Sequence, residues 1–215
     1  MHIPEWYINM SSYKTGTPIL SGGSIDNATV KRCAPVLDAF NFGYMAVLHC
    51  DVSIDTKELS NGEYEVVVQF ASEPAPIATR EYNNKYSLTM DNSYIPLEFV
   101  WLLRWQINTE PNSSVLITHP LNRLDLPFTT SSGVMDTDSG FMVNVSGAPF
   151  YIKKGFNGVI TAGTPMFQVI PFERQPYKYE VRELSEVNRY RRTLKWTKHF
   201  NNGYRKEHRA KKSFK

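Results

Sequence analysis

The stretch that decides the fold runs from Val115 to Arg174 and ends in GTPMFQVIPFER, residues 163–174. Within it, short apolar segments alternate with turns rich in Gly, Pro, Asn and Asp. Short strands at this spacing favour an antiparallel sandwich or barrel over parallel βαβ units. The expected strands are 114–118, 133–135, 141–145, 150–152, 157–160 and 166–172. We therefore predict a mainly β protein, an antiparallel jelly-roll-like barrel or sandwich.

The region before this stretch adds further strands. GYMAVLHCDVSI (residues 43–54) and EYEVVVQF (63–70) alternate as strands do, and Asn61-Gly62 predicts a tight turn between them. PLEFVWLLRWQIN (96–108) is strongly apolar. Its Trp101 and Trp105 are spaced as on a helix face, but the alternation fits a strand better, and we expect both rings in the core. A short helical turn is expected after Pro35.

Four segments follow from these patterns. Residues 1–28 are expected to form an irregular arm, because Pro and Gly interrupt any periodicity. Residues 29–176 form the predicted β-rich domain. Residues 177–203 repeat apolar positions at helical spacing and predict a basic amphipathic helix. Residues 204–215 have almost no apolar content and predict a flexible, disordered basic tail.

The charge of the chain is divided unevenly along its length. Residues 1–188 hold 13 Lys+Arg and 20 Asp+Glu, whereas residues 189–215 hold 11 Lys+Arg and 1 Glu. A basic segment on an acidic body points to nucleic acid or an acidic protein surface as its partner. It is also compatible with neutralisation of the body of its own or a neighbouring subunit, or with a solubility tag. The candidate partner-binding residues are Arg189, Arg191, Arg192, Lys195, Lys198, Arg205, Lys206, Arg209, Lys211 and Lys212.

Composition sets aside several other classes. No apolar run approaches the roughly 20 residues of a membrane span, and MHIPEWYINM lacks the features of a signal peptide, so we expect a soluble chain that is not exported. Cys33 and Cys50 are interpreted as thiols rather than a disulfide. Neither Cys nor His shows ligand spacing, so no metal site and no cofactor are predicted. In the loop HPLNRLD, an Arg123 to Asp125 ion pair is expected.

Two segments carry a family resemblance. SSGVMDTDSGFMVNV (131–145) and KKGFNGVITAGTPMFQVIPFER (153–174) resemble the second half of the deoxyuridine triphosphatase and deoxycytidine triphosphate deaminase superfamily. The resemblance implies that Asp136 orients an attacking water, that Asp138 and Gln168 are further site residues, and that Mg²⁺ holds a triphosphate. The chain has Ser139 where the superfamily has an aromatic residue. The alternatives are that Asp136 and Asp138 stabilise a turn, and that Gln168 is a buried amide satisfied by backbone groups.

A second resemblance covers most of residues 3–174. IPEW, TVKRCAPVLDAFNFGY, LLRWQIN and LITHPLNRLDLPF are similar to an uncharacterised family of proteins encoded by tailed phages, including phages of marine bacteria. It implies a phage protein acting in the host cytoplasm or the virion. We therefore predict a non-catalytic binding or assembly protein, a homo-oligomer without membrane attachment. The alternative is a divergent deoxynucleoside triphosphate hydrolase. A single-strand-binding module is a third reading that the acidic body disfavours.

Overall fold

Antiparallel strands dominate the structure, a computed structural model that describes residues 3–18, 24–80, 91–139, 147–183, 185–189, 204 and 209–210. The chain divides into two units, one formed by Met1–Phe42 with Gln175–Lys215 and one by Gly43–Arg174. We call them the terminal unit and the β unit. The β unit is smaller than the predicted domain 29–176, because residues 29–42 belong to the terminal unit.

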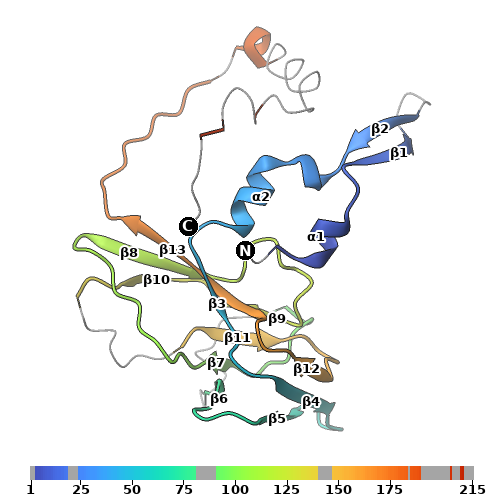
Figure 1. Ribbon diagram of the computed structural model, residues 1–215, viewed down its shortest axis with the longest axis vertical. Helices are drawn as coiled ribbons and strands as arrows, with labels where there is room; N and C mark the ends of the chain where they lie inside the picture. The colour runs from blue at the N-terminus through green and yellow to red at the C-terminus, as the bar shows by residue number, and fades with distance from the viewer. Residues whose placement is uncertain are drawn as a thin grey trace. The chain divides into compact units, whose positions relative to one another are not determined.

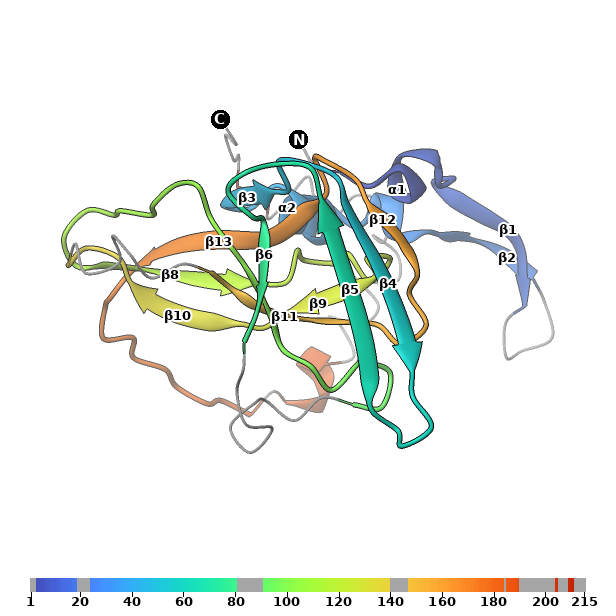
Figure 2. The ribbon, with the colours of Figure 1, turned by 90° about the horizontal axis from the view of Figure 1, so that it is seen from below.

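Three sheets build the β unit (Figures 1 and 2). The first has the order β10-β8-β13-β3, the second β6-β7-β11-β9 and the third β12-β4-β5. The strand bounds are β3 Tyr44–Val47, β4 Val52–Glu58, β5 Tyr64–Phe70, β6 Ile77–Thr79, β7 Phe99–Trp101, β8 Ser113–Thr118, β9 Phe128–Thr130, β10 Gly133–Asp136, β11 Pro149–Ile152, β12 Gly158–Ile160 and β13 Pro165–Glu173. Neighbouring strands pair antiparallel. The mainly antiparallel β prediction is confirmed. The sheets are not closed into a barrel, and the jelly-roll topology stays a prediction.

The hairpin predicted around Asn61-Gly62 is present. β4 pairs with β5 over their whole lengths, from Val52 opposite Phe70 to Glu58 opposite Tyr64. Gly62 has a φ of 82°, a left-handed conformation that suits glycine in such a turn. The predicted strand at 114–118 and those at 133–135, 150–152, 157–160 and 166–172 are also found, with bounds shifted by a few residues. The predicted strand 141–145 lies outside the described residues.

The predicted strand 43–54 is two strands in the structure. β3 lies in the first sheet and β4 in the third, because the chain between them is tied to the turn before β13. The Leu48 amide donates to the Thr164 carbonyl at 2.9 Å, and the Leu48 carbonyl accepts from Gly163 at 2.7 Å. Asp51 then accepts a bond from the Ala162 amide at 2.7 Å. Alternation along the sequence continues across this crossing, so it could not reveal the change of sheet.

The predicted strand 96–108 is correct only for Phe99–Trp101. Trp101 is fully buried, whereas Trp105 is 46% exposed, so the core prediction is wrong for the second tryptophan. After β7 the Leu102 amide donates to the Pro76 carbonyl, at 2.8 Å, and residues 102–112 run without a paired strand. An alternating sequence forms a strand only where another strand pairs with it.

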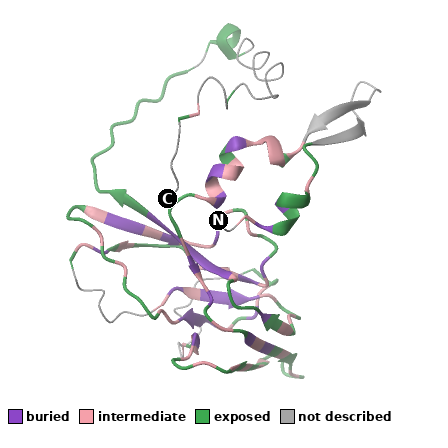
Figure 3. Ribbon diagram, viewed as in Figure 1, coloured by how far each residue is buried: buried purple, intermediate pink, exposed green. Residues whose placement is uncertain are grey.

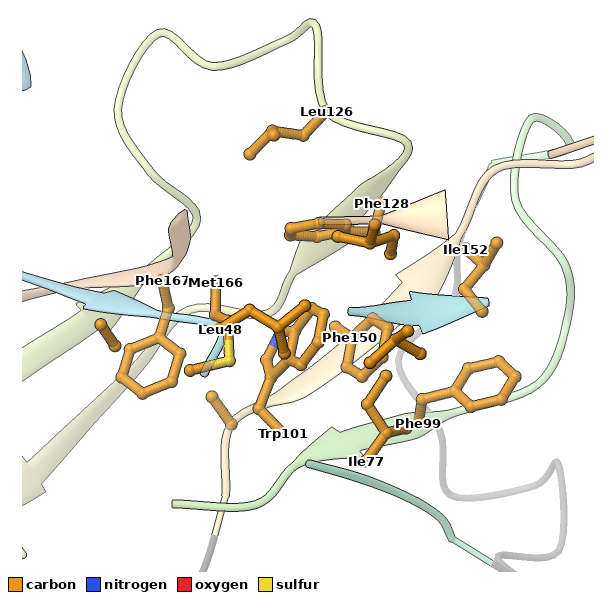
Figure 4. Close-up of a cluster of buried hydrophobic side chains, with 14 of the residues drawn as sticks. Leu48, Ile77, Phe99, Trp101, Leu126, Phe128, Phe150, Ile152, Met166 and Phe167 are labelled. Atoms are coloured by element: carbon orange, nitrogen blue, oxygen red, sulfur yellow. The ribbon is translucent and has the colours of Figure 1, made fainter. Parts of the chain in front are cut away.

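Many residues in the strands of the β unit are buried (Figure 3), and aromatic rings fill its core (Figure 4). Trp101 stacks on Phe150 with centroids 3.8 Å apart and planes inclined by 10°, and Phe128 meets both rings edge-on. The indole N–H donates to the Thr130 hydroxyl at 3.1 Å, and that hydroxyl donates to the Met166 carbonyl at 2.7 Å. Thr130, itself buried, therefore joins the second sheet to the first through β13.

The terminal unit begins with more order than the predicted irregular arm 1–28. It contains helix α1 Glu5–Asn9, the hairpin β1 Tyr13–Pro18 and β2 Ser24–Ala28, the 3₁₀ helix η1 Val30–Arg32, and helix α2 Ala34–Phe40. Gly16 lies within β1 and Pro18 ends it, since a two-stranded sheet tolerates a missing N–H on its outer side. The helical turn expected after Pro35 is confirmed as α2. Tyr7 packs against Phe40, and its hydroxyl donates to the Lys31 carbonyl at 3.0 Å.

The helix predicted over 177–203 is wrong for its first part. Residues 175–183 have no regular structure and are all exposed, with Tyr179 at 91%. Residues 186–189 are helical, and 190–203 lie outside the described residues. An amphipathic helix is stabilised mainly by packing of its apolar face. Residues 177–183 bury none of their side chains in the structure, so nothing there stabilises a helix.

Candidate functional site

The last residue of the β unit, Arg174, collects the polar groups at one end of the first sheet. It follows β13, which pairs with β8 so that Phe172 lies opposite Ser114. β10 lies on the other side of β8 and places Asp136 opposite the same serine. The three strands lie side by side in Figure 1. Their pairing brings Arg174, Asp136 and Ser114 together, and Asp138 follows β10 two residues later. We call these four residues the arginine cluster.

Arg174 is bound through its side chain and its backbone. Its guanidinium donates to the Ser113 carbonyl at 2.9 Å, to the Ser114 hydroxyl at 3.1 Å and to both oxygens of Asp138. Its amide donates to the Asn112 carbonyl at 2.9 Å, and its carbonyl accepts from the Asn112 side chain at 3.2 Å. Asn112 has a φ of 65°, which asparagine tolerates better than most residues. The arginine is thus fixed in one orientation.

The two aspartates differ in their surroundings. The carboxylate of Asp138 also accepts the Asn112 amide at 2.8 Å, and its hydrogen bonds with Arg174 hold its pKa below the usual range. The same contact raises the pKa of Arg174. Asp136 accepts the Ser114 hydroxyl at 2.6 Å and lies 3.2 Å from Arg174, but its side chain is 67% exposed. The carboxylate of Asp138 is engaged by Arg174 and the Asn112 amide, whereas the side chain of Asp136 faces water.

Gln168 does not belong to the arginine cluster. It is fully buried and lies opposite Thr118, four residues along β8 from the Ser114 that faces Asp136. At about 3.3 Å per residue, this separation is about 13 Å. Its side-chain oxygen accepts the Leu121 amide at 2.9 Å. The interpretation of Gln168 as a buried amide bonded to the backbone is confirmed. Within one chain, Gln168 lies away from Asp136 and Asp138.

The loop between β8 and β9 is held by His119. Nδ1 of His119 accepts the Thr130 amide at 3.2 Å, so the other nitrogen, Nε2, carries the proton and donates to the Arg123 carbonyl at 2.9 Å. Burial lowers the pKa of His119, and the charges of Lys153 and Arg123 add to this effect. The predicted ion pair of Arg123 with Asp125 is confirmed, with contacts of 2.9 Å. His119 is therefore a neutral support for this loop rather than a free base.

One predicted partner-binding residue makes a contact inside the terminal unit. Arg209 donates through Nε to Asp38 at 3.1 Å, and this pairing raises the pKa of Arg209. Asp38 lies on α2 and is buried. Of the other candidates, Arg189 is exposed, and its amide donates to the Ser185 carbonyl at 2.9 Å. The remaining ones lie outside the described residues: Arg191, Arg192, Lys195, Lys198, Arg205, Lys206, Lys211 and Lys212.

The donors of the arginine cluster do not suit a magnesium ion. Mg²⁺ prefers carboxylate and water oxygens in an octahedral shell. Here Arg174 lies between the two carboxylates and offsets one of their two negative charges. Elsewhere, the described residues hold no group of three or more His, Cys, Asp or Glu side chains arranged for a metal. Cys33 and Cys50 are free thiols, as the sequence predicted.

Sequence reasoning identified the two aspartates but missed Arg174 and Ser114. The one signal for Arg174 was its position directly after the long, largely apolar strand β13. No helix among the described residues is long and apolar enough to cross a bilayer. Comparison with known proteins gives no family: no protein-family model matches the chain, and no curated protein matches it.

Proposed function

We propose that this chain is a non-catalytic binding or assembly protein, of the kind tailed phages encode, whose basic C-terminal residues contact a polyanion. The observation that carries the proposal is the division of charge, net +10 in residues 189–215 against −7 in residues 1–188. Such a segment attracts nucleic acid or an acidic protein surface by releasing or replacing counterions.

The geometry of the β unit supports a non-catalytic role. The three residues that the superfamily resemblance nominates fall in two places, and Gln168 and Asp138 are already engaged in contacts. His119 uses both ring nitrogens to hold a loop. A general base must be free to reach the proton that it removes. Among these groups, only Asp136 has a largely exposed side chain.

Binding is tested by fluorescence anisotropy of labelled single-stranded and duplex DNA across a salt series. We expect the logarithm of the affinity to fall linearly with the logarithm of salt concentration, with a slope of about 0.9 per phosphate neutralised on duplex DNA. Changing Lys195 and Lys198 to Gln should reduce the slope by about 2. The matched control changes Lys57 and Lys154, two exposed lysines of the β unit, and should leave the slope unchanged.

Removal of residues 189–215 separates the possible partners. If DNA binding disappears, nucleic acid is a partner of the segment. If DNA never binds but a polyglutamate chain does, the partner is an acidic protein surface. Equal DNA affinity of the full-length and truncated chains would contradict the proposal, because residues 1–188 would then carry the binding.

The exposure of Asp136 beside Arg174 and a hydroxyl keeps the hydrolase alternative open. A carboxylate beside a cation is a suitable setting for activating water near a phosphate. The chain is incubated with deoxynucleoside triphosphates and Mg²⁺, and pyrophosphate, phosphate and base conversion are measured. Turnover that Asp136→Asn abolishes would establish the hydrolase. Under our proposal, neither protein shows turnover.

A further inference from the structure

β5 is an open sheet edge of unusual length. It ends the sheet β12-β4-β5, and in the described part of the chain no strand pairs with its outer side (Figure 2). β5 has seven residues, whereas the other edge strands of the β unit, β3, β6, β9, β10 and β12, have three or four. Open edges are usually protected by Pro, Lys, a bulge or a short length. YEVVVQF has no Pro and no Lys, its one charged residue is Glu65 on the exposed face, and its register with β4 is regular.

The residues of β5 are chemically symmetric about Val67. Tyr64 and Phe70 are aromatic, Val66 and Val68 are identical, and Glu65 and Gln69 have side chains of the same shape. Residues at equal distances from Val67 therefore match in type. A strand of this kind can pair antiparallel with a copy of itself about a two-fold axis through Val67, since each residue then meets a residue of matching type on the other copy.

We propose that β5 is a self-association edge, on which β5 of a second copy of this chain pairs antiparallel, centred on Val67. The two three-stranded sheets then join into one of six strands. Tyr64 lies opposite Phe70 of the partner subunit, and Val66 lies opposite Val68 of the partner subunit. These four residues are half-buried in the single chain and pack at the margin of the core, so pairing covers their remaining exposed surface.

The exposed face of β5 fits the same register. Glu65, Val67 and Gln69 point outward, and Val67 is 44% exposed. In the symmetric register Glu65 meets an uncharged Gln69 of the partner subunit. Two like charges, which would destabilise the pair, therefore do not face each other. Antiparallel pairing also places the two acidic hairpin tips, which carry Glu58 and Glu63, at opposite ends of the interface. A parallel arrangement would put these carboxylates side by side.

Charge at the neighbouring strand does not oppose the pairing. Asp55 on β4 lies beside Val67 in its own chain. The corresponding Asp55 residues of the two copies are separated by three strand spacings, about 14 Å. This exceeds the screening length of about 8 Å at physiological ionic strength. A second copy of the chain is therefore a suitable occupant of the edge in both its backbone and its side chains.

The first test measures oligomeric state by sedimentation velocity of the full-length chain. We expect a concentration-dependent dimer that Val67→Lys abolishes, because two lysines would meet at the two-fold axis. Val159→Lys is the matched control: Val159 is an exposed valine, at 54%, on β12 at the opposite edge of the same sheet. A chain that stays monomeric up to its solubility limit, or a dimer that survives Val67→Lys, would overturn the proposal.

The second test changes the Glu65–Gln69 pairs between the two copies and leaves Val67, at the two-fold axis, unaltered. Gln69→Lys places a lysine opposite Glu65 of the partner subunit, twice per dimer, and should strengthen dimerisation by roughly 2- to 30-fold. Gln69→Glu places two carboxylates together and should weaken it by a similar factor. Changes of the same sign in both variants would contradict the register.

A third test fixes the centre of the interface. Antiparallel partners have Cα atoms about 4.5 or 5.5 Å apart, within the range that a disulfide spans. Val67→Cys should therefore form a covalent dimer under mild oxidation, beyond the background of Cys33 and Cys50 in the unaltered chain. Val159→Cys should give background levels only. Equal crosslinking of the two variants would refute β5 as the contact. None of these tests depends on residues 189–215.

Discussion

Replacement of Thr130 by valine tests the connection between the first and second sheets of the β unit. Valine has the shape of threonine but lacks the hydroxyl. The change removes the bond from the Trp101 indole, 3.1 Å long, and the bond to the Met166 carbonyl, 2.7 Å long. Thr130 is 3% exposed and Trp101 is fully buried, so water cannot replace either partner without entering the core. We therefore expect a clear loss of stability from an isosteric change.

The size of the loss follows from the groups left behind. A buried donor without an acceptor costs about 1–3 kcal/mol, and a lost carbonyl bond costs roughly another 0.5–1.5 kcal/mol. The additional buried methyl group offsets about 0.8 kcal/mol. The net effect is a decrease of about 2 kcal/mol, within a range of roughly 1–4 kcal/mol, in the free energy of unfolding. With a urea m-value of about 2 kcal/mol/M for a domain of this size, the midpoint falls by roughly 1 M.

Urea unfolding is followed by tryptophan fluorescence and, as a second probe, by circular dichroism. The control is Thr129→Val, one residue earlier on β9, at a half-buried position whose hydroxyl takes no part in these contacts. The reasoning is refuted if Thr130→Val stays within about 0.5 kcal/mol of the unaltered chain at an unchanged m-value, a shift no larger than ordinary surface substitutions give.

Three further predictions concern other parts of the chain. Gly147→Ala should lower the free energy of unfolding by at least about 2 kcal/mol, since Gly147 has a φ of 108° and a Cβ there would meet Val100 and the Trp101 carbonyl. Gly62→Ala, with open space around it, should cost less in the same urea titration. His119 has a lowered pKa in the folded state, so the unfolded chain binds the proton more readily and the free energy of unfolding should fall as pH drops below about 6.5. In urea midpoints measured across a pH series, His119→Gln should remove this decrease. An identical pH dependence in both proteins would contradict the prediction. Asp38→Asn should release Arg209 and speed tryptic cleavage after it relative to Asp55→Asn, and equal cleavage rates would show that the pair does not hold this part of the tail.

Sequence patterns predicted correctly the strands that pair with a segment adjacent in the sequence. The Asn61-Gly62 turn joins adjacent segments, so the β4–β5 hairpin could be read from eight or nine consecutive residues on each side. The crossing between β3 and β4 could not, because it depends on bonds from Leu48 to residues 163 and 164, more than one hundred positions away. The same holds for Trp105, whose exposure reflects the absence of a neighbouring strand rather than any property of its own segment.

The candidate site shows the same division. Asp136 and Asp138 could be found because they are two residues apart in a turn motif. Their partner Arg174 is 36 positions from Asp138 and is brought there by the pairing of β8 with both β10 and β13. The pair of Asp38 with Arg209 spans 171 positions, so no periodicity in the sequence could signal it.

The anchoring of Arg174 has a mechanical consequence. This residue is a point at which a pull on residues 175–215 enters the β unit. β13 lies between two antiparallel neighbours, β8 and β3, and a force along its axis loads their hydrogen bonds in shear. Bonds loaded in shear must break together, whereas bonds at a peeled edge break one at a time. The bonds of Arg174 to Asn112, Ser113 and Asp138 hold the end of β13 against peeling. A partner could therefore draw the tail taut without unravelling the sheet.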